Sequence, residues 1–159
     1  MLSAVSVGFF LILAGLLFIS TPGLYDSLVK FFSDPWITGK VSGISLPLPQ
    51  AGLQTYLDIF ETARQFSVIW GVFLIALLGG RLILGSTVRR LAENAGDIVF
   101  WLGAAYLIQV LLVANSSLAG SADRQATASV EFWASIIALI GISLIVRAIF
   151  LFAARLRRS

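Results

Sequence analysis

The sequence predicts an all-α integral membrane protein, a bundle of four transmembrane helices with a short interfacial helix in its first outer loop. The main observation is composition: of the 159 residues, 58% are hydrophobic and 12% are charged, and the mean hydropathy is +0.97. Soluble domains are about a quarter charged. The second observation is the recurrence of uncharged segments long enough to cross the ~30 Å hydrocarbon core as helices. Four spans of ~20 residues use half of the chain, so 1–159 is expected to be a single membrane domain.

The first predicted span covers about residues 3–20, in a segment that carries no charge before Asp26. A cleavable signal peptide is the alternative interpretation. However, the segment has no basic residue at its start, and Phe18-Ile19-Ser20 is a poor match to a small-residue cleavage site. We therefore expect an uncleaved first helix.

The predicted outer stretch 21–54 contains all four prolines of the chain. Apolar residues at helical spacing near its start predict a short amphipathic helix that lies in the membrane interface. Its apolar face would carry Leu24, Leu28, Phe31 and Phe32. Residues 43–50 cannot continue a helix, because Pro47 and Pro49 lack donors and force extended geometry on the residues before them. We expect a linker there, with a partner-docking segment as the alternative.

The second predicted helix runs from Leu53 to Gly85. At 1.5 Å per residue it would be about 50 Å long, which exceeds the ~30 Å hydrocarbon core, so its first turns should protrude. Further along, Gly96 is placed as a helix stop and Asp97 as the cap of the third helix. The expected segments are a span at 66–85, a cytoplasmic loop at 86–97, a span at 98–114, an outer loop at 115–129, a span at 130–153 and a basic cytoplasmic tail at 155–159.

Basic residues are distributed unequally between the two sides of this topology. The side of the termini carries Arg81, Arg89, Arg90, Arg147, Arg155, Arg157 and Arg158, and the other side carries Lys30, Lys40, Arg64 and Arg124. Cytoplasmic loops of membrane proteins carry the excess of Lys and Arg. We therefore expect a multi-pass protein of the cell (plasma) membrane with both termini cytoplasmic.

Arg147 is the most informative charge in the predicted spans. Eight residues, or about 12 Å of helix, separate it from Arg155, and the residues between them are apolar. An arginine at the centre of a span costs ~2.5–3.5 kcal/mol on insertion scales. In one interpretation Arg147 snorkels to phosphates of anionic inner-leaflet lipids. In the other it forms an intramembrane ion pair with Asp97 or Glu93, or an anion site with Arg81.

A second candidate site lies on the outer side, where Asp58, Glu61 and Arg64 are three residues apart and share one helix face. Such a face could bind a cation or a partner, but it is more often a solvated, ion-paired surface.

Several residues in the predicted spans are suited to contacts between helices. Gln109 and Asn115 are expected to hydrogen-bond across to a neighbouring helix, and small residues such as Gly71 and Gly103 permit close approach. Arg89 and Glu93 have the i,i+4 spacing of a surface ion pair.

The chain contains no cysteine and no histidine, which removes thiolate chemistry, imidazole metal ligands and the commonest general base. No motif has the spacing of a nucleotide-binding loop, a metal site or a nucleophile with its base. We therefore expect no enzyme activity, no cofactor and no nucleic-acid partner.

The expected function is that of a structural, accessory-subunit or scaffold protein without chemistry of its own. Its partners would be the bilayer, its anionic inner-leaflet lipids and other membrane subunits or copies of itself. The alternative is a small homo-oligomeric channel or transporter with its pathway between subunits. The first function is favoured because polar groups in the spans are few and no acidic residue lies deep in a span.

Overall fold

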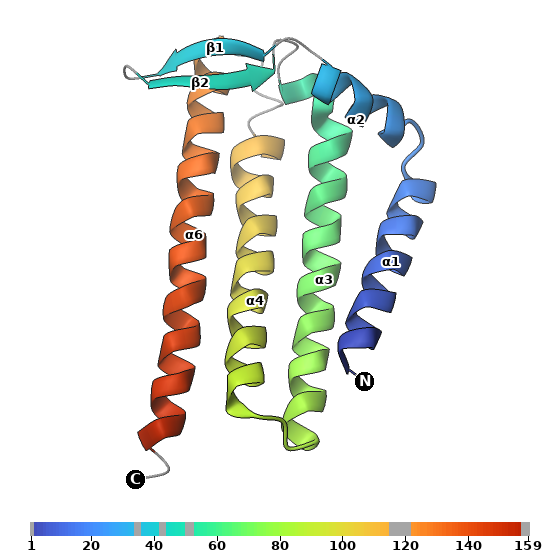
Figure 1. Ribbon diagram of the computed structural model, residues 1–159. Helices are drawn as coiled ribbons and strands as arrows, with labels where there is room; N and C mark the ends of the chain where they lie inside the picture. The colour runs from blue at the N-terminus through green and yellow to red at the C-terminus, as the bar shows by residue number, and fades with distance from the viewer. Residues whose placement is uncertain (1, 34–35, 42–43, 50–52, 115–121, 157–159) are drawn as a thin grey trace.

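The computed structural model describes residues 2–33, 36–41, 44–49, 53–114 and 122–156 (Figure 1). The helical class is confirmed, and a two-stranded antiparallel hairpin adds to it. The elements are α1 (Leu2–Ser20), α2 (Leu24–Ser33), β1 (Trp36–Val41), β2 (Ile44–Pro49), the 3-10 helix η1 (Leu53–Tyr56), α3 (Leu57–Ile83), α4 (Val88–Leu107), the π-helix η2 (Ile108–Val113) and α6 (Ala122–Leu156).

Three helical segments are long and apolar enough to cross a membrane. They are Leu57–Ile83, Val88–Val113 and Val130–Leu156. A fourth crossing results if α1 and α2 form one span, although these two helices are bent by 94° relative to each other. The structure therefore supports three membrane-crossing helices and up to four.

The helices lie in a row in the order α6, α4, α3 and α1 (Figure 1). The closest packing joins α4 to α6 and α3 to α4, and α1 lies beside α3 at the edge of the row. The predicted four-helix bundle is not confirmed by this arrangement. A membrane protein does not need a closed apolar core, because lipid tails are as apolar as the side chains they touch.

Glycines lie at the contacts of α4 with its two neighbours, α3 and α6. A Cβ built on Gly71 of α3 would lie 2.5 Å from Leu102 Cδ2 on α4. One built on Gly103 of α4 would lie 3.0 Å from Leu139 Cδ2 on α6, and closer still to Cδ1. A Cβ at either position would require the facing leucine side chain to shift, so the present packing uses the space that glycine leaves.

Aromatic rings join α1 to α3. Phe9 stacks on Phe73 with ring centroids 4.0 Å apart. One position further along α1, Phe10 meets Phe66 edge-on at 5.4 Å. Such pairs are worth about 0.5–1.5 kcal/mol beyond their buried area, which helps to hold this edge helix in place.

The predicted short helix after the first span is present as α2. Gly23 adopts a φ of 80°, which glycine reaches without steric cost, and this conformation turns the chain between α1 and α2. The side chain of Leu24 is buried, and the Phe31 ring packs edge-on against Tyr56 at 5.0 Å. Phe32, assigned to the same apolar face, is exposed.

Two of the prolines, Pro47 and Pro49, lie in β2. β1 pairs with β2 so that Trp36 lies opposite Pro49 and Thr38 opposite Pro47. Each strand of a two-stranded sheet has a free edge, and prolines are tolerated at edges. The expectation that this segment cannot be helical is confirmed, but the hairpin itself was not predicted. Both strands lie near α6.

The predicted connection at 86–97 is too long. The α3 helix ends in a Schellman motif, in which Gly85 has a φ of 65° and the Ser86 N–H donates to the Arg81 carbonyl at 3.0 Å. Because α4 already begins at Val88, four residues join the two helices. The assignments of Gly96 as a helix stop and Asp97 as a cap are therefore wrong.

The physical reason for this error is the composition of the first turns of α4. Residues 88–95 (VRRLAENA) consist largely of good helix formers, and glycine in a helix costs only ~1 kcal/mol relative to alanine. Contacts that Gly96 makes with α6 offset that penalty.

The remaining boundaries differ in a similar way. The α6 helix begins at Ala122 instead of residue 130, so it includes part of the predicted outer loop. The rest of that loop, residues 115–121 with Asn115, lies outside the described residues. From Leu57 onward the predicted protruding turns are α-helical, while their depth in the membrane stays a prediction.

Candidate functional site

The candidate site lies between α4 and α6 and consists of Gly96, Asp97, Ser143 and Arg147, called the α4–α6 polar site below. Ser143 and Arg147 are four residues apart and therefore share one face of α6. Gly96 and Asp97 are adjacent in α4, eight and nine residues after its first residue. Helix packing thus gathers groups that are about fifty residues apart in the sequence.

Two polar contacts cross the interface at this site. Arg147 Nη2 donates to Asp97 Oδ1 at 2.6 Å. One helical turn away, the buried Ser143 hydroxyl donates to the Gly96 carbonyl at 3.0 Å. Both contacts join α6 to the same turn of α4.

Gly96 makes room for the arginine side chain. A Cβ built on Gly96 would lie 2.5 Å from Arg147 Cγ and 2.9 Å from Cδ, and even closer to Nε. The apolar stem of Arg147 therefore lies directly on the α4 backbone, which carries its guanidinium to Asp97. Its Nε is buried and has no hydrogen-bond partner among the residues that the structure describes.

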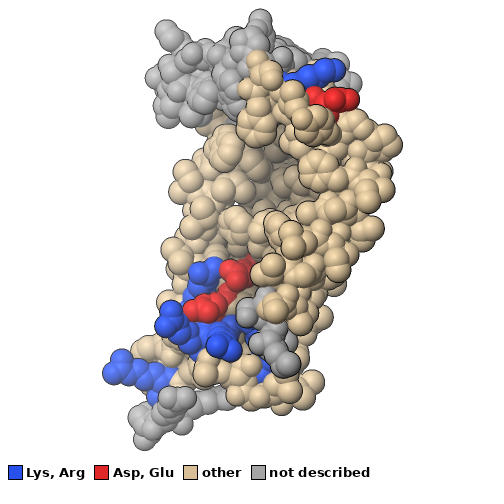
Figure 2. All heavy atoms as spheres, turned by 45° about the vertical axis from the view of Figure 1, so that its right-hand side comes forward, with Lys and Arg blue, Asp and Glu red and all other residues tan. Residues whose placement is uncertain are grey.

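The other charges near this site are arranged around the Asp97 carboxylate. Glu93 and Arg81 are within electrostatic range of it. Arg81 directs its Nη1 to the Arg90 carbonyl at 3.2 Å, whereas Arg147 binds Asp97, so the two arginines have different hydrogen-bond partners. Figure 2 shows acidic side chains lying among basic ones at this end of the molecule.

Glu93 takes part in a separate pair. Its Oε1 accepts a hydrogen bond from Arg89 Nε at 3.0 Å, as the i,i+4 spacing predicts. Of the two acidic partners considered for Arg147, the structure therefore places Asp97 against it and leaves Glu93 to Arg89.

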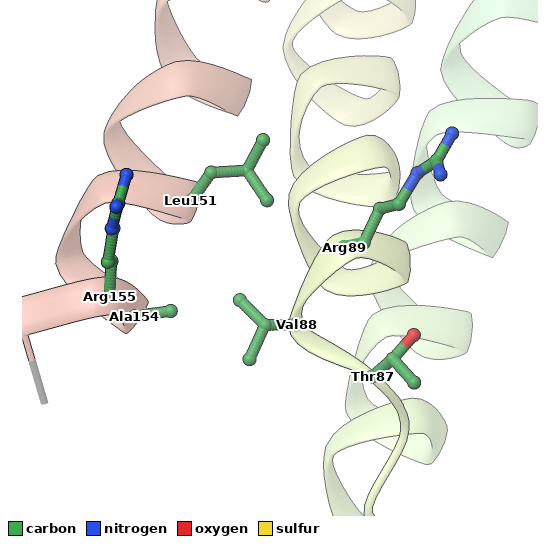
Figure 3. Close-up of a pocket in the computed structure, with 6 residues that line it drawn as sticks. All are labelled: Thr87, Val88, Arg89, Leu151, Ala154 and Arg155. Atoms are coloured by element: carbon green, nitrogen blue, oxygen red, sulfur yellow. The ribbon is translucent and has the colours of Figure 1, made fainter. Parts of the chain in front are cut away.

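A pocket of about 390 Å³ lies beyond this site, where the start of α4 meets the end of α6. Figure 3 shows Val88, Leu151 and Ala154 pointing into the gap between the two helices, whereas the Arg89 and Arg155 side chains point away from it. The two arginines do not converge, so this pocket has no arrangement suited to an anion.

The predicted outer face of α3 carries residues with different surroundings. Asp58 is exposed and Glu61 is half-buried. Arg64 instead turns toward the next helix, where its Nη1 donates to Gln109 Oε1. The structure thus shows the interhelical contact that Gln109 was expected to make and identifies Arg64 as its partner.

Two polar residues that hold the helices together were missed in the sequence. Asn94 is 2% exposed, and its Nδ2 donates to the Leu74 carbonyl on α3 at 2.8 Å. Ser143 binds α4 as described above. The four-residue spacing of Ser143 from Arg147 was a usable signal, whereas Asn94 was placed in a loop because the start of α4 was misassigned.

The chemistry open to the α4–α6 polar site is limited. An arginine and a carboxylate neutralise each other, and a serine bonded to a backbone carbonyl has no base to activate it. Within the described part of the chain, no group of three or more acidic, histidine or cysteine side chains is placed to hold a metal ion. The site is therefore suited to joining helices.

Comparison with protein-family models, with curated proteins and with solved structures finds no match for this chain.

Proposed function

We propose that this protein is a structural membrane protein, an accessory subunit or scaffold that performs no chemistry of its own. One observation carries the proposal. Among the described residues, the buried polar side chains are Ser67, Asn94 and Ser143, and each donates to a backbone carbonyl. The Ser67 bond stays within α3, whereas the bonds of Asn94 and Ser143 cross to a neighbouring helix. The buried polar side chains are therefore used within and between helices, which favours a structural role over a path for solutes.

The outer surfaces of the row support an environment of lipid or other membrane subunits. Large apolar side chains are exposed along both edge helices. On α1 they include Leu11, Ile12, Leu16 and Ile19, and on α6 they include Ile137, Leu144, Ile145, Ile149 and Phe152. Monomeric soluble proteins rarely expose continuous apolar surfaces of this kind to water.

We further propose a location in the cell membrane with both termini cytoplasmic. Figure 1 places both termini and the α3–α4 connection toward one end of the row, and the hairpin at the other. The end with the termini is the one rich in arginine, which supports a cytoplasmic position for it. The amphipathic α2 would then lie in the outer interface, where its exposed Tyr25 and Phe32 can contact headgroups.

Native mass spectrometry of the gently solubilised protein, combined with ion-flux measurements in liposomes, tests the structural role. We expect the measured particle mass to exceed the 17.1 kDa of one chain. Liposomes that contain the purified protein should show no more ion flux than protein-free liposomes. Masses that are multiples of the single chain, together with ion flux, would support the homo-oligomeric channel instead. A chain that remains monomeric both in mild detergent and in lipid nanodiscs would contradict both roles.

A further inference from the structure

A groove of about 540 Å³ lies between α3 and the α4–η2 helix, on the half of the molecule nearer the hairpin. Its lining changes from polar to apolar along its length. The polar part includes Arg64, Tyr106 and Gln109, and the apolar part includes Val68, Ile69 and Leu102.

The order of residues along the two antiparallel helices produces this gradient. On α3, Arg64 comes one turn before Val68, which puts the arginine nearer the hairpin. On the neighbouring helix Gln109 comes two turns after Leu102, which also puts the polar residue nearer the hairpin. The groove is therefore polar at its outer end and apolar toward the middle of the membrane-crossing helices, as a phospholipid is.

Arg64 keeps a positive charge available at the polar end. Its contact is with the neutral amide oxygen of Gln109, and the ion pairs of the described residues join other groups, Arg89 with Glu93 and Arg147 with Asp97. Neither Asp58 nor Glu61 lines the groove. A guanidinium carries five N–H donors in a planar fork that matches phosphate oxygens, so one bond to Gln109 leaves donors free for an anion.

The depth of Arg64 agrees with a headgroup contact. Seven residues, or about 10 Å of helix, separate it from Leu57 at the start of α3. The 27 residues of α3 span about 40 Å, which exceeds the ~30 Å hydrocarbon core by ~5 Å at each end when the helix is centred in the bilayer. The Arg64 backbone then lies ~5 Å below the headgroup boundary, within reach of a snorkelling side chain.

The π-helix η2 contributes to the same site. It extends from Ile108 to Val113 and therefore includes Gln109. π-helical turns inside α-helices are rare and are found frequently at functional sites. Here the turn carries the amide that holds the Arg64 guanidinium at the polar end of the groove.

We propose that this groove binds an anionic phospholipid from the leaflet on the hairpin side, with its phosphate on Arg64 and an acyl chain along Val68, Ile69 and Leu102. The site goes beyond the proposed structural role and does not depend on it, because it is formed by a single chain. It would give this protein a bound lipid at a fixed position between two of its membrane-crossing helices.

Thermal unfolding of the delipidated full-length protein in detergent tests the proposal. We would add phosphatidylglycerol, diacylglycerol, which lacks the phosphate, or glycerol 3-phosphate, which lacks the chains. The phospholipid should raise the Tm, and the other two compounds should leave it unchanged. Equal stabilisation by diacylglycerol would show that the phosphate is not recognised. Stabilisation by glycerol 3-phosphate alone would indicate a small-anion site and overturn the lipid assignment.

Two variants with matched controls locate the site. Arg64→Gln should lower the apparent affinity for the phospholipid, taken from the dependence of the Tm on lipid concentration, by about tenfold, because it removes a charge-assisted hydrogen bond. The control Arg89→Gln, at the exposed Arg89–Glu93 pair, should keep the affinity of the natural protein. Val68→Trp should fill the apolar part of the groove and abolish the effect with the charge intact. Val72→Trp, one turn further along α3 and outside the groove lining, should behave as the natural protein does. An unchanged lipid response in both Arg64→Gln and Val68→Trp would overturn the proposal.

Discussion

Arg147 Nη2 lies 2.6 Å from Asp97 Oδ1, and this pair joins α6, at one edge of the row, to its neighbour α4. Each partner alone would put a charge into a membrane-crossing helix, at a cost of a few kcal/mol. Together they are neutral and hydrogen-bonded. The structure therefore assigns the arginine a partner within the protein, where the sequence favoured lipid phosphate.

The first prediction concerns the energy of this pair. Arg147→Ala should lower the free energy of unfolding by about 1.5–3 kcal/mol, the range for hydrogen bonds to charged groups, because it leaves the Asp97 carboxylate unpaired. The double variant Arg147→Ala, Asp97→Asn should recover much of that loss, since neighbouring groups are coupled in a mutant cycle. Thermal or denaturant unfolding in detergent measures both effects. Strictly additive effects would show that lipid contact, and not Asp97, accounts for Arg147.

The conservative variant Arg147→Lys separates the same two explanations. A snorkelling lysine would serve as well as arginine. At the observed site, however, the side chain must lie flat on Gly96 and present a planar donor group to Asp97. We expect Arg147→Lys to recover only part of the stability lost in Arg147→Ala.

The second prediction tests the close approach of α4 and α6. Gly96→Ala puts a methyl group where the Arg147 side chain lies, so it should destabilise the protein by about 1–3 kcal/mol, as overpacking does. Gly79→Ala is the matched control, because a Cβ at this helical glycine meets nothing within 4 Å. The control should be neutral or stabilising by up to about 1 kcal/mol through helix propensity. Equal effects of the two substitutions would contradict the packing described here.

The third prediction compares a buried polar contact with an exposed one on the same helix. Asn94→Ala removes the bond to the Leu74 carbonyl on α3 and should cost about 0.6–2 kcal/mol, the range for interhelical hydrogen bonds in membranes. Glu93→Gln, one residue earlier, breaks the exposed pair with Arg89 and should change stability by less than about 0.5 kcal/mol. Unfolding curves in which Glu93→Gln is the more damaging change would argue against the burial of Asn94.

The fourth prediction addresses orientation. Because the chain has no cysteine, a single cysteine can be placed at Ser86, in the α3–α4 connection, or at Ser33, at the end of α2. In intact cells an impermeant thiol reagent should label Ser33→Cys and leave Ser86→Cys unlabelled until the membrane is permeabilised. The reverse labelling pattern would place the arginine-rich end outside.

The pattern of apolar residues predicted the helical elements well where the signal was strong. The segment of α1, the amphipathic α2 and the helices α3 and α6 all follow from long apolar runs or from helical spacing. The prediction failed at the start of α4, because a glycine followed by an aspartate resembles a helix end when it is considered locally. Only the packing of Arg147 on Gly96 shows why glycine is needed inside this helix.

The candidate residues divide in the same way. Arg147 was found from the sequence because a charge in an apolar run is conspicuous. Ser143 and Asn94 were missed because serine and asparagine occur commonly both in loops and in membrane helices. The outer triad was grouped by spacing, but Arg64 belongs to the groove formed with Gln109, which lies 45 residues away in the sequence.

The sequence by itself determined that this chain is a helical membrane protein and which end of it is rich in arginine, since hydropathy and charge are sums over local residues. Only the tertiary structure decided that the helices form a row, that Arg147 meets Asp97, and that Arg64 faces a groove with an apolar floor. Those relationships depend on the rotation and register of one helix against another. Small residues and buried polar groups set that register at positions far apart in the chain, so no local pattern records them.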